Sequence, residues 1–339
     1  MANIRDIAER CGLSVSTVSK ALNSYSDVSG ETRRRVLKTA EECGYFPNSI
    51  ARALKTNRTH NLGVLFVDEA QSGLKHDYFA AVLDSFKVAA ERHFYDITFI
   101  NHTIKIGNRP MTYLEHCRYR NFDGVCIACI DFQKPEVIEL VNSDLPVVTI
   151  DHVFNNHTSI NSANVQGMRE LVTYLYKMGH RKIAYIHGEK SAVTEQRLTS
   201  FCKTLTDLGV ATPPQYLAVS PYHDPEAVRS RVREMLALPE RPTCIVLPDD
   251  YVALGAMEEI ETMGFRIPED VSIAGYDGIP LSQAIRPRLT TLKQDTEQLG
   301  REAAERLIAQ IENPLTTIME NVTVVGKLIR GQSVAGISV

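Results

Sequence analysis

Five polar residues near the amino terminus have the spacing and the chemistry to read DNA. Ser16, Thr17, Ser19, Lys20 and Asn23 share the polar face of a predicted helix. Short hydroxyl and amide side chains hydrogen-bond to base edges and phosphates, and the lysine adds a cation. The alternative is an ordinary pair of helices whose serine-rich face is turned to water. The spacing alone leaves both interpretations open.

A second set of polar residues lies where predicted strands end. Its members are all aspartates: Asp68, Asp131, Asp151, Asp249, Asp250 and Asp277. Ligands of open α/β sheets bind beyond the carboxyl ends of the strands, so this set predicts a ligand site. An aspartate in this place is also a common helix N-cap, and Asp250, before a predicted helix, suits that role.

The cysteines and histidines indicate neither disulfide nor metal chemistry. Seven scattered cysteines in a chain without a secretory signal are typical of reduced thiols. Cys126 and Cys129 form a C-x-x-C inside an apolar, strand-like run, and no second pair completes a zinc site. His76, His152 and His157 lack metal-ligand spacing. We therefore predict no metal and no cofactor.

Two alternatives to a DNA-binding regulator deserve a test against the sequence. A hydrolase or sugar-modifying enzyme would use Asp249 and Asp277 as acid and base. A sugar-binding protein without gene control would need only the ligand site. The sequence contains no glycine-rich phosphate loop or nucleophile elbow, and a DNA-binding head would serve no purpose in either case. We predict that the chain is not an enzyme.

Two short predicted helices position the DNA-reading residues. The first ends at Gly12, a natural stop, and the second begins after Ser14, which can cap it. Their apolar residues recur at helical spacing: Ile4, Ile7, Ala8 and Cys11 in the first helix, and Val15, Val18 and Leu22 in the second. This is the pattern of a helix-turn-helix. A third helix follows, capped by Ser29 and ended by Gly44.

The remaining chain, from Asn61 on, alternates short apolar runs with amphipathic stretches. The strands that we expect are 62–67, 97–101, 124–130, 147–151, 182–187, 244–247 and 271–277, and the helices include 78–92, 165–178, 251–263 and 296–311. Alternation of this kind predicts parallel sheets covered by helices. Some ten such units exceed one sheet, so we expect two Rossmann-like lobes with a ligand between them.

Charge and hydropathy agree with this division. Residues 1–58 carry ten Lys and Arg against six Asp and Glu, whereas the remainder carries 27 against 35. A basic head on an acidic body suggests that the head meets a polyanion. No apolar run approaches the roughly 20 residues that span a bilayer, and residues 1–10 lack the apolar core of a secretory signal. We expect a cytoplasmic protein that associates with the nucleoid through DNA.

The head resembles one family closely. The stretches that carry the resemblance are Ile4–Ala8, Val15–Asn23, Glu31–Val36 and Gly44–Asn48, and in the body Gly179–Ala184, Asp250–Ala256, Ile267–Ser272, Gly275–Asp277 and Leu289–Thr291. Together they resemble the lactose-repressor/galactose-repressor (LacI/GalR) family over nearly the whole chain. The resemblance implies a helix-turn-helix head and a periplasmic-binding-protein-like core of two parallel-sheet lobes.

By this resemblance, Val15, Ser16 and Lys20 read bases, while Thr17, Ser19 and Asn23 hold phosphates. Ala51 and Leu54 belong to a short hinge helix on the DNA, with Leu54 as a wedge in the minor groove. The effector contacts that the resemblance implies are Tyr78, Phe79, Arg197, Phe201, Asp249, Asp277 and Gln294. The chain departs from the family at 162–164 and 68–77, and it has no tryptophan.

These observations give one prediction of organisation and function. Residues 1–46 form the DNA-binding domain and 47–60 the hinge and linker. Residues 61–339 form the core, with a first lobe of about 61–160 plus 293–320 and a second of about 161–292 plus 321–339. We expect a repressor that binds a pseudopalindromic operator as a homodimer, or as a tetramer of dimers. A sugar or sugar derivative between the lobes would control it allosterically.

Overall fold

The computed structural model describes residues 2–22, 25–45, 58–67, 73–101 and 105–337. The chain divides into two units, Met1–Thr59 and His60–Val339, each with its own core. Four residues of the predictions, Asn23, Ala51, Leu54 and Asp68, lie outside the described residues.

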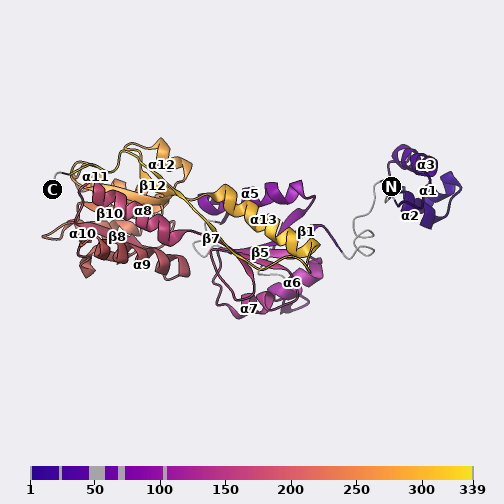
Figure 1. Ribbon diagram of the computed structural model, residues 1–339, viewed down its shortest axis with the longest axis horizontal. Helices are drawn as coiled ribbons and strands as arrows, with labels where there is room; N and C mark the ends of the chain where they lie inside the picture. Colours follow the sequence, from indigo (N-terminus) through magenta and orange to yellow (C-terminus); the bar gives the residue numbers. More distant parts are fainter. Residues whose placement is uncertain (1, 23–24, 46–57, 68–72, 102–104, 338–339) are drawn as a thin grey trace. The chain divides into compact units, whose positions relative to one another are not determined.

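The described part of the first unit, the head, contains three helices (Figure 1). Its helices are α1 (Ile4–Cys11), α2 (Val15–Leu22) and α3 (Gly30–Glu42). Gly12 adopts φ 58° and ends α1, as its conformational freedom allows. Ser14 Oγ accepts the Thr17 amide at 3.0 Å, and Ser29 Oγ accepts the Thr32 amide at 3.2 Å. The predicted helix-turn-helix and both predicted caps are therefore confirmed.

The head is held by a small apolar core. The buried residues are Ile7, Ala8, Cys11, Val18, Ala21, Val36 and Ala40. The predicted apolar spacing accounts for most of them, since one face of each helix turns inward. Val15 is an exception: it begins α2 and is 41% exposed. Its side chain is therefore available on the surface of the head.

The second unit alternates strands with helices. The strands are β1 (Asn61–Phe66), β2 (Asp96–Phe99), β3 (Lys105–Ile106), β4 (Arg109–Pro110), β5 (Gly124–Ala128), β6 (Val147–Ile150), β7 (Thr158–Ser162), β8 (Ile183–His187), β9 (Leu217–Val219), β10 (Cys244–Val246), β11 (Ser272–Asp277), β12 (Thr290–Lys293), β13 (Asn321–Val324) and β14 (Lys327–Ile329). The α-helices are α5 (Asp77–Arg92), α6 (Tyr113–Arg120), α7 (Pro135–Val141), α8 (Asn164–Lys177), α9 (Ala192–Asp207), α10 (Val228–Leu236), α11 (Asp250–Thr262), α12 (Pro280–Ala284) and α13 (Thr296–Glu312). Two short 3-10 helices are η1 (Gly73–Lys75) and η2 (Pro214–Tyr216).

The first lobe is a parallel sheet between two helical layers. The strand order is β13-β7-β6-β5-β1-β2, and every neighbouring pair is parallel. Helices α5 and α13 share one apolar core with the sheet, and α6 and α7 share another. Strands β5 and β6 are buried throughout, in keeping with their mainly apolar sequences.

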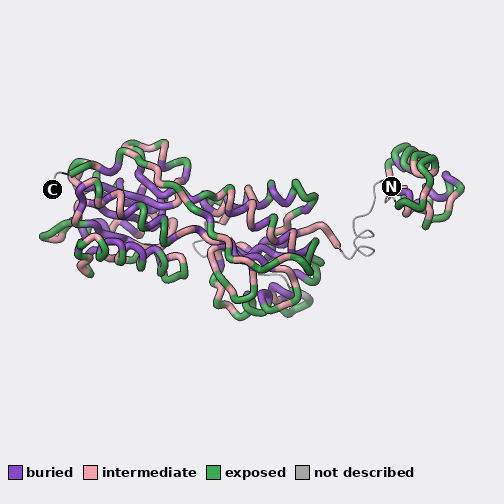
Figure 2. The backbone as a smooth tube through the Cα atoms, in the orientation of Figure 1, coloured by how far each residue is buried: buried purple, intermediate pink, exposed green. Residues whose placement is uncertain are grey.

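The second lobe repeats this arrangement. Its order is β14-β12-β11-β10-β8-β9, and β14 alone is antiparallel to its neighbour. Helices α8 and α9 pack in one apolar core, and α10 and α11 pack in the other. Burial follows the sheets in both lobes, whereas the outer helix faces are exposed (Figure 2). The predicted two-lobed α/β core is confirmed.

The chain crosses between the lobes at β7–α8, β12–α13 and β13–β14. The lobe boundaries expected from the sequence need correction at these crossings. Residues 321–324 form β13 of the first sheet, although we assigned them to the second lobe, and β7 extends to Ser162. Lys293 ends β12 of the second sheet. The error arises because β7, β12, β13 and β14 are short and polar enough to lack an apolar pattern.

None of the helices in the described ranges has the length and apolar character that crossing a membrane requires.

Candidate functional site

Helix α2 presents the predicted DNA-reading residues on the head. Ser16 is exposed, and Thr17, Ser19 and Lys20 are half-buried. The Thr17 hydroxyl lies 2.8 Å from Ser14 Oγ, so the helix cap holds it in place. The structure thus groups four of the predicted residues on one short helix, beside the exposed Val15. Their contacts with DNA remain predictions.

Lys20 forms an ion pair within the head. Its Nζ donates to Asp27 Oδ2 at 2.5 Å, and this hydrogen bond raises the pKa of the lysine. Both side chains are about half exposed, so the pair is weak and open to competition. A DNA phosphate or a guanine edge can therefore replace Asp27 as the partner of Lys20. No sequence pattern predicted this pairing.

Polar side chains from the two lobes gather at the carboxyl ends of the two sheets. We call this set the interlobe cluster: Tyr78, Asp151 and Ser162 from the first lobe, and Asn164, Arg197, Asp249, Tyr276, Asp277 and Gln294 from the second. Electrostatic interactions join its halves, since Asp277 acts on both Asp151 and Tyr78. Strand ends of open sheets are where such sites are expected.

Arg197 is the central cation of the interlobe cluster. It extends from α9 and is only 4% exposed. Its Nε donates to Asn164 Oδ1 at 2.8 Å and its Nη1 to the Pro248 carbonyl at 3.2 Å. The guanidinium lies 3.7 Å from the centre of the Tyr276 ring, and Nη2 lies 4.0 Å from Asp277 Oδ1. Four contacts therefore fix the guanidinium, while Nη2 keeps donor capacity.

Asp277 and Gln294 form a hydrogen-bonded pair beside Arg197. Asp277 ends β11 with φ 100°, and Gln294 follows β12 directly. Gln294 Nε2 donates to Asp277 Oδ1 at 2.6 Å. Gln294 Oε1 is buried and accepts no hydrogen bond from the described residues. A buried acceptor without a donor is costly, so this atom is a natural contact for a ligand.

Asp249 serves as a helix cap within the cluster. Its Oδ1 accepts the Val252 amide at 2.7 Å, which makes it the N-cap of α11, and its Oδ2 accepts the His223 amide at 2.9 Å. Burial raises the pKa of Asp249 to about 7, and the charge of Asp277 adds to this effect. Its carboxylate therefore already has backbone partners on both oxygens.

Asp250 does not cap α11, contrary to our expectation. It is the first residue of the helix and is fully buried. Its Oδ1 accepts from Thr291 Oγ1 at 2.5 Å and its Oδ2 from the Ile279 amide at 2.9 Å. Asp250 thus ties α11 to β12 and to the loop after β11. The sequence could not decide between two adjacent aspartates.

Tyr78 and Asp151 supply the first-lobe side of the cluster. The Tyr78 hydroxyl donates to Asp151 Oδ2 at 2.8 Å, and Asp151 Oδ1 accepts the Ser162 amide at 3.0 Å. Burial raises the pKa of Asp151, and burial raises the pKa of Tyr78 well above its ordinary value. Asp151 was predicted only as a strand-end acid, and its partner Tyr78 as an effector contact.

The two phenylalanines of the prediction lie in different surroundings. Phe79 is half-buried on α5, 4.9 Å from the Tyr78 ring and 5.5 Å from the Phe66 ring. Phe201 is fully buried in the core of the second lobe, 5.0 Å from the Tyr185 ring. Phe201 therefore packs as a core residue beneath the cluster, because its side chain points from α9 into the sheet.

A stack of three rings links the lobes beside the cluster. His76 of the first lobe lies 4.6 Å from His223 of the second, with a 25° angle between the rings. His223 in turn stacks on Tyr251 at 4.1 Å and 6°. Since Asp249 holds the His223 amide, the stack is joined to the cluster. From the sequence we noted His76 only for its lack of metal-ligand spacing, and the structure places its ring in this stack.

The sequence analysis missed a further aromatic residue at this place. The Tyr222 hydroxyl lies 2.8 Å from Thr194 Oγ1, and Arg197 and Tyr222 interact electrostatically. Gly188 accommodates the Tyr222 ring, since a Cβ at that position would lie 1.9 Å from it. Residues 220–223 show no periodic pattern, so nothing in the sequence pointed to them.

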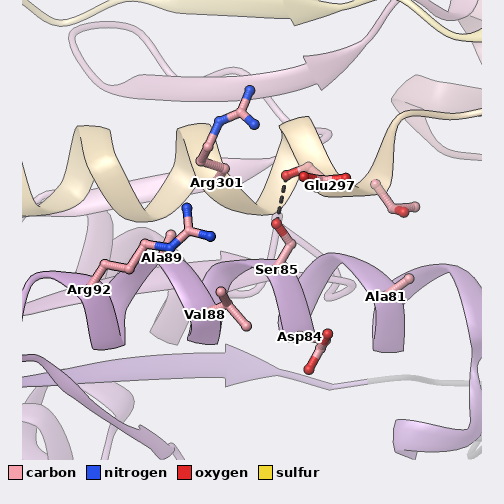
Figure 3. A pocket seen from close by; sticks show the side chains of 9 residues that line it. Ala81, Asp84, Ser85, Val88, Ala89, Arg92, Glu297 and Arg301 are labelled. Atoms are coloured by element: carbon pink, nitrogen blue, oxygen red, sulfur yellow. Dashed lines mark hydrogen bonds between the residues drawn. The ribbon is translucent and has the colours of Figure 1, made fainter.

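A separate groove runs between α5 and α13 in the first lobe (Figure 3). It encloses about 320 Å³ and is lined by Ala81, Asp84, Ser85, Val88, Ala89, Arg92, Thr296, Glu297 and Arg301. The Ser85 hydroxyl donates to the Glu297 carbonyl at 2.6 Å across it. The groove shares no residue with the interlobe cluster, and helix-surface charges line it, so it is a separate feature of the first lobe.

The first cysteine of the C-x-x-C pair is a core residue, and the second, Cys129, is half-buried. Cys126 is fully buried in β5, and burial raises the pKa of its thiol to about 12. A thiol with so high a pKa is a poor nucleophile and a poor metal ligand. The interpretation of the pair as a part of the core is supported for Cys126.

Comparison with known proteins agrees with this geometry. Residues 3–48 match the family described as bacterial regulatory proteins, lacI family, and residues 172–334 match the periplasmic binding protein-like domain. The ribose operon repressor of Haemophilus influenzae is 32% identical, over 93% of each chain. The transcriptional repressor PurR of Pasteurella multocida is 31% identical, over 92% of each chain.

A solved structure extends the likeness to the whole fold. The lac repressor dimer bound to operator and the anti-inducer ONPF is 25% identical, with a TM-score of 0.84 over 98% of this chain and 99% of that one. These relatives are repressors rather than enzymes, which excludes the hydrolase alternative. With a helix-turn-helix head, a two-lobed core and relatives over more than nine tenths of its length, the chain belongs to the LacI family of DNA-binding repressors with a small-molecule effector.

Proposed function

We propose that this repressor binds a pseudopalindromic operator as a dimer and that a sugar or sugar derivative, bound at the interlobe cluster, controls this binding. Two relatives support the proposal: one is named for the ribose operon, and the lac repressor was solved as a dimer on operator. A single helix-turn-helix buries too little surface for operator affinity alone, which favours two heads on two half-sites.

The DNA contacts of the proposal lie on α2. Val15, Ser16 and Lys20 read base edges, and Thr17 and Ser19 hold phosphates. The proposal adds Asn23, Ala51 and Leu54, which lie outside the described residues. Its physical support is the exposed polar face of a short helix held against α1 and α3 by a buried apolar core.

The effector contacts of the proposal are Tyr78, Phe79, Arg197, Asp277 and Gln294. The observation that carries the proposal is the buried meeting of Arg197 and Asp277 with the Tyr78–Asp151 pair of the other lobe. A guanidinium donor beside carboxylate and amide acceptors suits the vicinal hydroxyls of a sugar. Asp249 supports the site as the cap of α11, and Phe201 supports it from the core.

Because the cluster draws on both lobes, a ligand bound there changes the relative stability of their orientations. The operator must then change effector affinity by the same factor as the effector changes operator affinity. Whether the effector releases or promotes DNA binding depends on which orientation it favours. We place the protein in the cytoplasm, at the nucleoid, where operator DNA is found.

The proposal can be tested with the full chain alone. An operator is first selected from random duplexes, and its binding is then followed by fluorescence anisotropy against a panel of sugars, sugar derivatives and nucleosides. The selected sequence should contain two related half-sites, and at least one compound should change operator affinity. Selection of a single asymmetric site, with no response to any compound, would contradict the proposal.

A further inference from the structure

The interlobe cluster holds polar atoms that the described protein leaves without partners. Gln294 is 4% exposed, and its Oε1 accepts no hydrogen bond from the described residues. The orientation of its amide is fixed, because the reverse orientation would place Oε1 against the Asp277 carboxylate, 2.6 Å away. The unpartnered atom is therefore an acceptor, and it requires a donor that the described residues do not supply.

A second unpartnered group lies nearby. The Tyr185 side chain extends from β8 and is fully buried, and its hydroxyl has no hydrogen-bond partner among the described residues. Its electrostatic neighbours are Arg197, Tyr222, Tyr276 and Asp249. A buried hydroxyl among these groups is well placed to meet a ligand hydroxyl, since it can both donate and accept.

The charges of the cluster bear on the charge that a ligand can carry. It contains three carboxylates, those of Asp151, Asp249 and Asp277, and one guanidinium, that of Arg197. Asp277 already opposes the guanidinium at 4.0 Å. Burial raises the pKa of Asp151 and of Asp249, which means that the site disfavours even its own negative charges. A phosphate or carboxylate on the ligand would add another anion to this environment and would offer acceptors where donors are needed.

We infer that the interlobe cluster selects an uncharged, polyhydroxylated ligand whose hydroxyls donate to Gln294 Oε1 and Asp277, and that it rejects the phosphorylated and carboxylated counterparts of that ligand. The inference rests on the proposed function, since it takes the cluster to be the effector site. Arg197 Nη2 and the Tyr185 hydroxyl supply the donors for the ligand's oxygens. The effector is thus a free sugar or a nucleoside rather than a sugar phosphate, a uronic acid or a nucleotide.

Matched pairs of compounds test this inference. The full chain is titrated calorimetrically, at constant ionic strength, with ribose and ribose 5-phosphate, glucose, glucose 6-phosphate and glucuronate, and adenosine and adenosine monophosphate. At least one uncharged member should bind, and its anionic partner should bind at least about 100-fold more weakly, as expected for like charges in a buried site. Constant ionic strength keeps screening equal across each pair.

Two variants test the cause. Asp277→Asn removes one negative charge and keeps the side-chain oxygen that faces Gln294, so discrimination against the anionic partner should fall at least tenfold. Asp207→Asn is the matched control, because Asp207 is an exposed acid on α9 paired with Lys203. It should leave discrimination unchanged. Equal discrimination in wild type and Asp277→Asn would overturn the electrostatic part of the inference.

The remaining outcomes separate this inference from the proposed function. If an anionic member binds as tightly as its uncharged partner, and Arg197→Ala abolishes that binding, the inference fails while the effector site stands. If no uncharged member of the panel binds, the inference also fails. If a ligand binds and Arg197→Ala leaves its affinity unchanged, the proposed function itself has placed the site wrongly.

Discussion

At the scale of single residues, the account depends on side chains whose charges are already partly satisfied within the protein. Lys20 is paired with Asp27, Asp249 caps a helix, and Arg197 is held by a side-chain amide and a backbone carbonyl. Each of these contacts must be replaced, kept or strengthened when DNA or effector binds. Substitution of the internal partner is therefore as informative as substitution of the functional residue.

Asp27→Asn is expected to strengthen DNA binding modestly. The substitution removes the ion pair that competes with DNA for Lys20, and an exposed pair contributes at most about 1 kcal/mol. The affinity for the selected operator should therefore rise by about two- to fivefold, as measured by fluorescence anisotropy. Lys20→Ala is the complementary variant and should change base preference rather than lower all affinities equally. A lower affinity of Asp27→Asn would show that Asp27 supports the head instead.

Asp249 should give the protein a characteristic pH dependence. Its pKa is about 7 in the folded chain, against an ordinary value of about 3.9, so between about pH 4 and pH 7 the native state holds a proton that the unfolded state has lost. Folding stability therefore falls as the pH rises through this window, by at most about 1.4 kcal/mol per pH unit from this group, and levels off above it.

Asp249→Asn removes this titration. Asparagine caps helices as well as aspartate does, so α11 should remain intact. Thermal midpoints measured from pH 4 to pH 8 should fall less steeply in the variant than in wild type. Asp224→Asn serves as the matched control, because Asp224 is a half-buried aspartate of the same lobe that also accepts backbone amides. Identical slopes in wild type and Asp249→Asn would mean that Asp249 is ionised throughout.

At the scale of elements, the sequence predicted the helices and strands that carry a clear apolar pattern. The long helices α5, α8, α11 and α13 and the apolar strands β1, β5, β6 and β11 were found within a few residues. Strands with short or polar sequences, such as β7 and β13, were missed, and with them the true crossings between the lobes. Pairing with a neighbouring strand, rather than local apolar pattern, determines where these segments lie.

The contacts between the lobes were likewise predicted only in part. Arg197 and Asp277 were predicted by resemblance, and both belong to the cluster. The His76–His223 stack and Tyr222 could not be predicted, because each joins loops that are far apart in sequence and carry no periodic pattern. The sequence cannot decide whether Phe201, about one turn after Arg197 on α9, faces the ligand or the core, and the structure buries its side chain in the core of the second lobe.

The ring stack yields a prediction about lobe closure. His223→Ala removes the middle ring between His76 and Tyr251, and an aromatic pair contributes about 0.5–1.5 kcal/mol. Effector affinity, measured by calorimetry, should fall by roughly two- to tenfold for each pair lost. Tyr251→Phe keeps the ring and should bind effector as wild type does. Unchanged affinity in His223→Ala would show that the stack does not stabilise the bound orientation.

The contact between α5 and α13 yields another prediction. A Cβ at Gly300 would lie 2.1 Å from the Val82 carbonyl oxygen and 2.6 Å from the Phe86 amide nitrogen, so the two helix backbones approach closely there. Gly300→Ala should force the helices apart and lower the free energy of unfolding by roughly 1–3 kcal/mol, measured by denaturant titration.

Gly30→Ala is the matched control for this substitution. Gly30 begins α3, and nothing lies within 4 Å of the position that its Cβ would take. Alanine should be tolerated there, with a helix-propensity gain of up to about 1 kcal/mol. Equal stability of Gly300→Ala and wild type would contradict the close approach of the helix backbones.

At the scale of the whole molecule, the head and the core carry separate chemistry. The head offers a polar helix face and a basic balance of charge to DNA, and the core offers a buried cluster of hydrogen-bonding groups to a small molecule. Membership of the family predicts that DNA binding by the head and ligand binding by the core are coupled. Coupling of this kind is a difference in free energy between two states, and it acts equally in both directions.

The most direct test of the account is therefore the affinity of the full chain for its selected operator, measured by anisotropy with and without saturating effector, in wild type and in Arg197→Ala. Coupling between the interlobe cluster and the head predicts a change of about 5- to 150-fold in wild type and no change in Arg197→Ala, which should bind the operator as the effector-free wild type does. The same operator affinity in wild type with and without a ligand that demonstrably binds the interlobe cluster would contradict it.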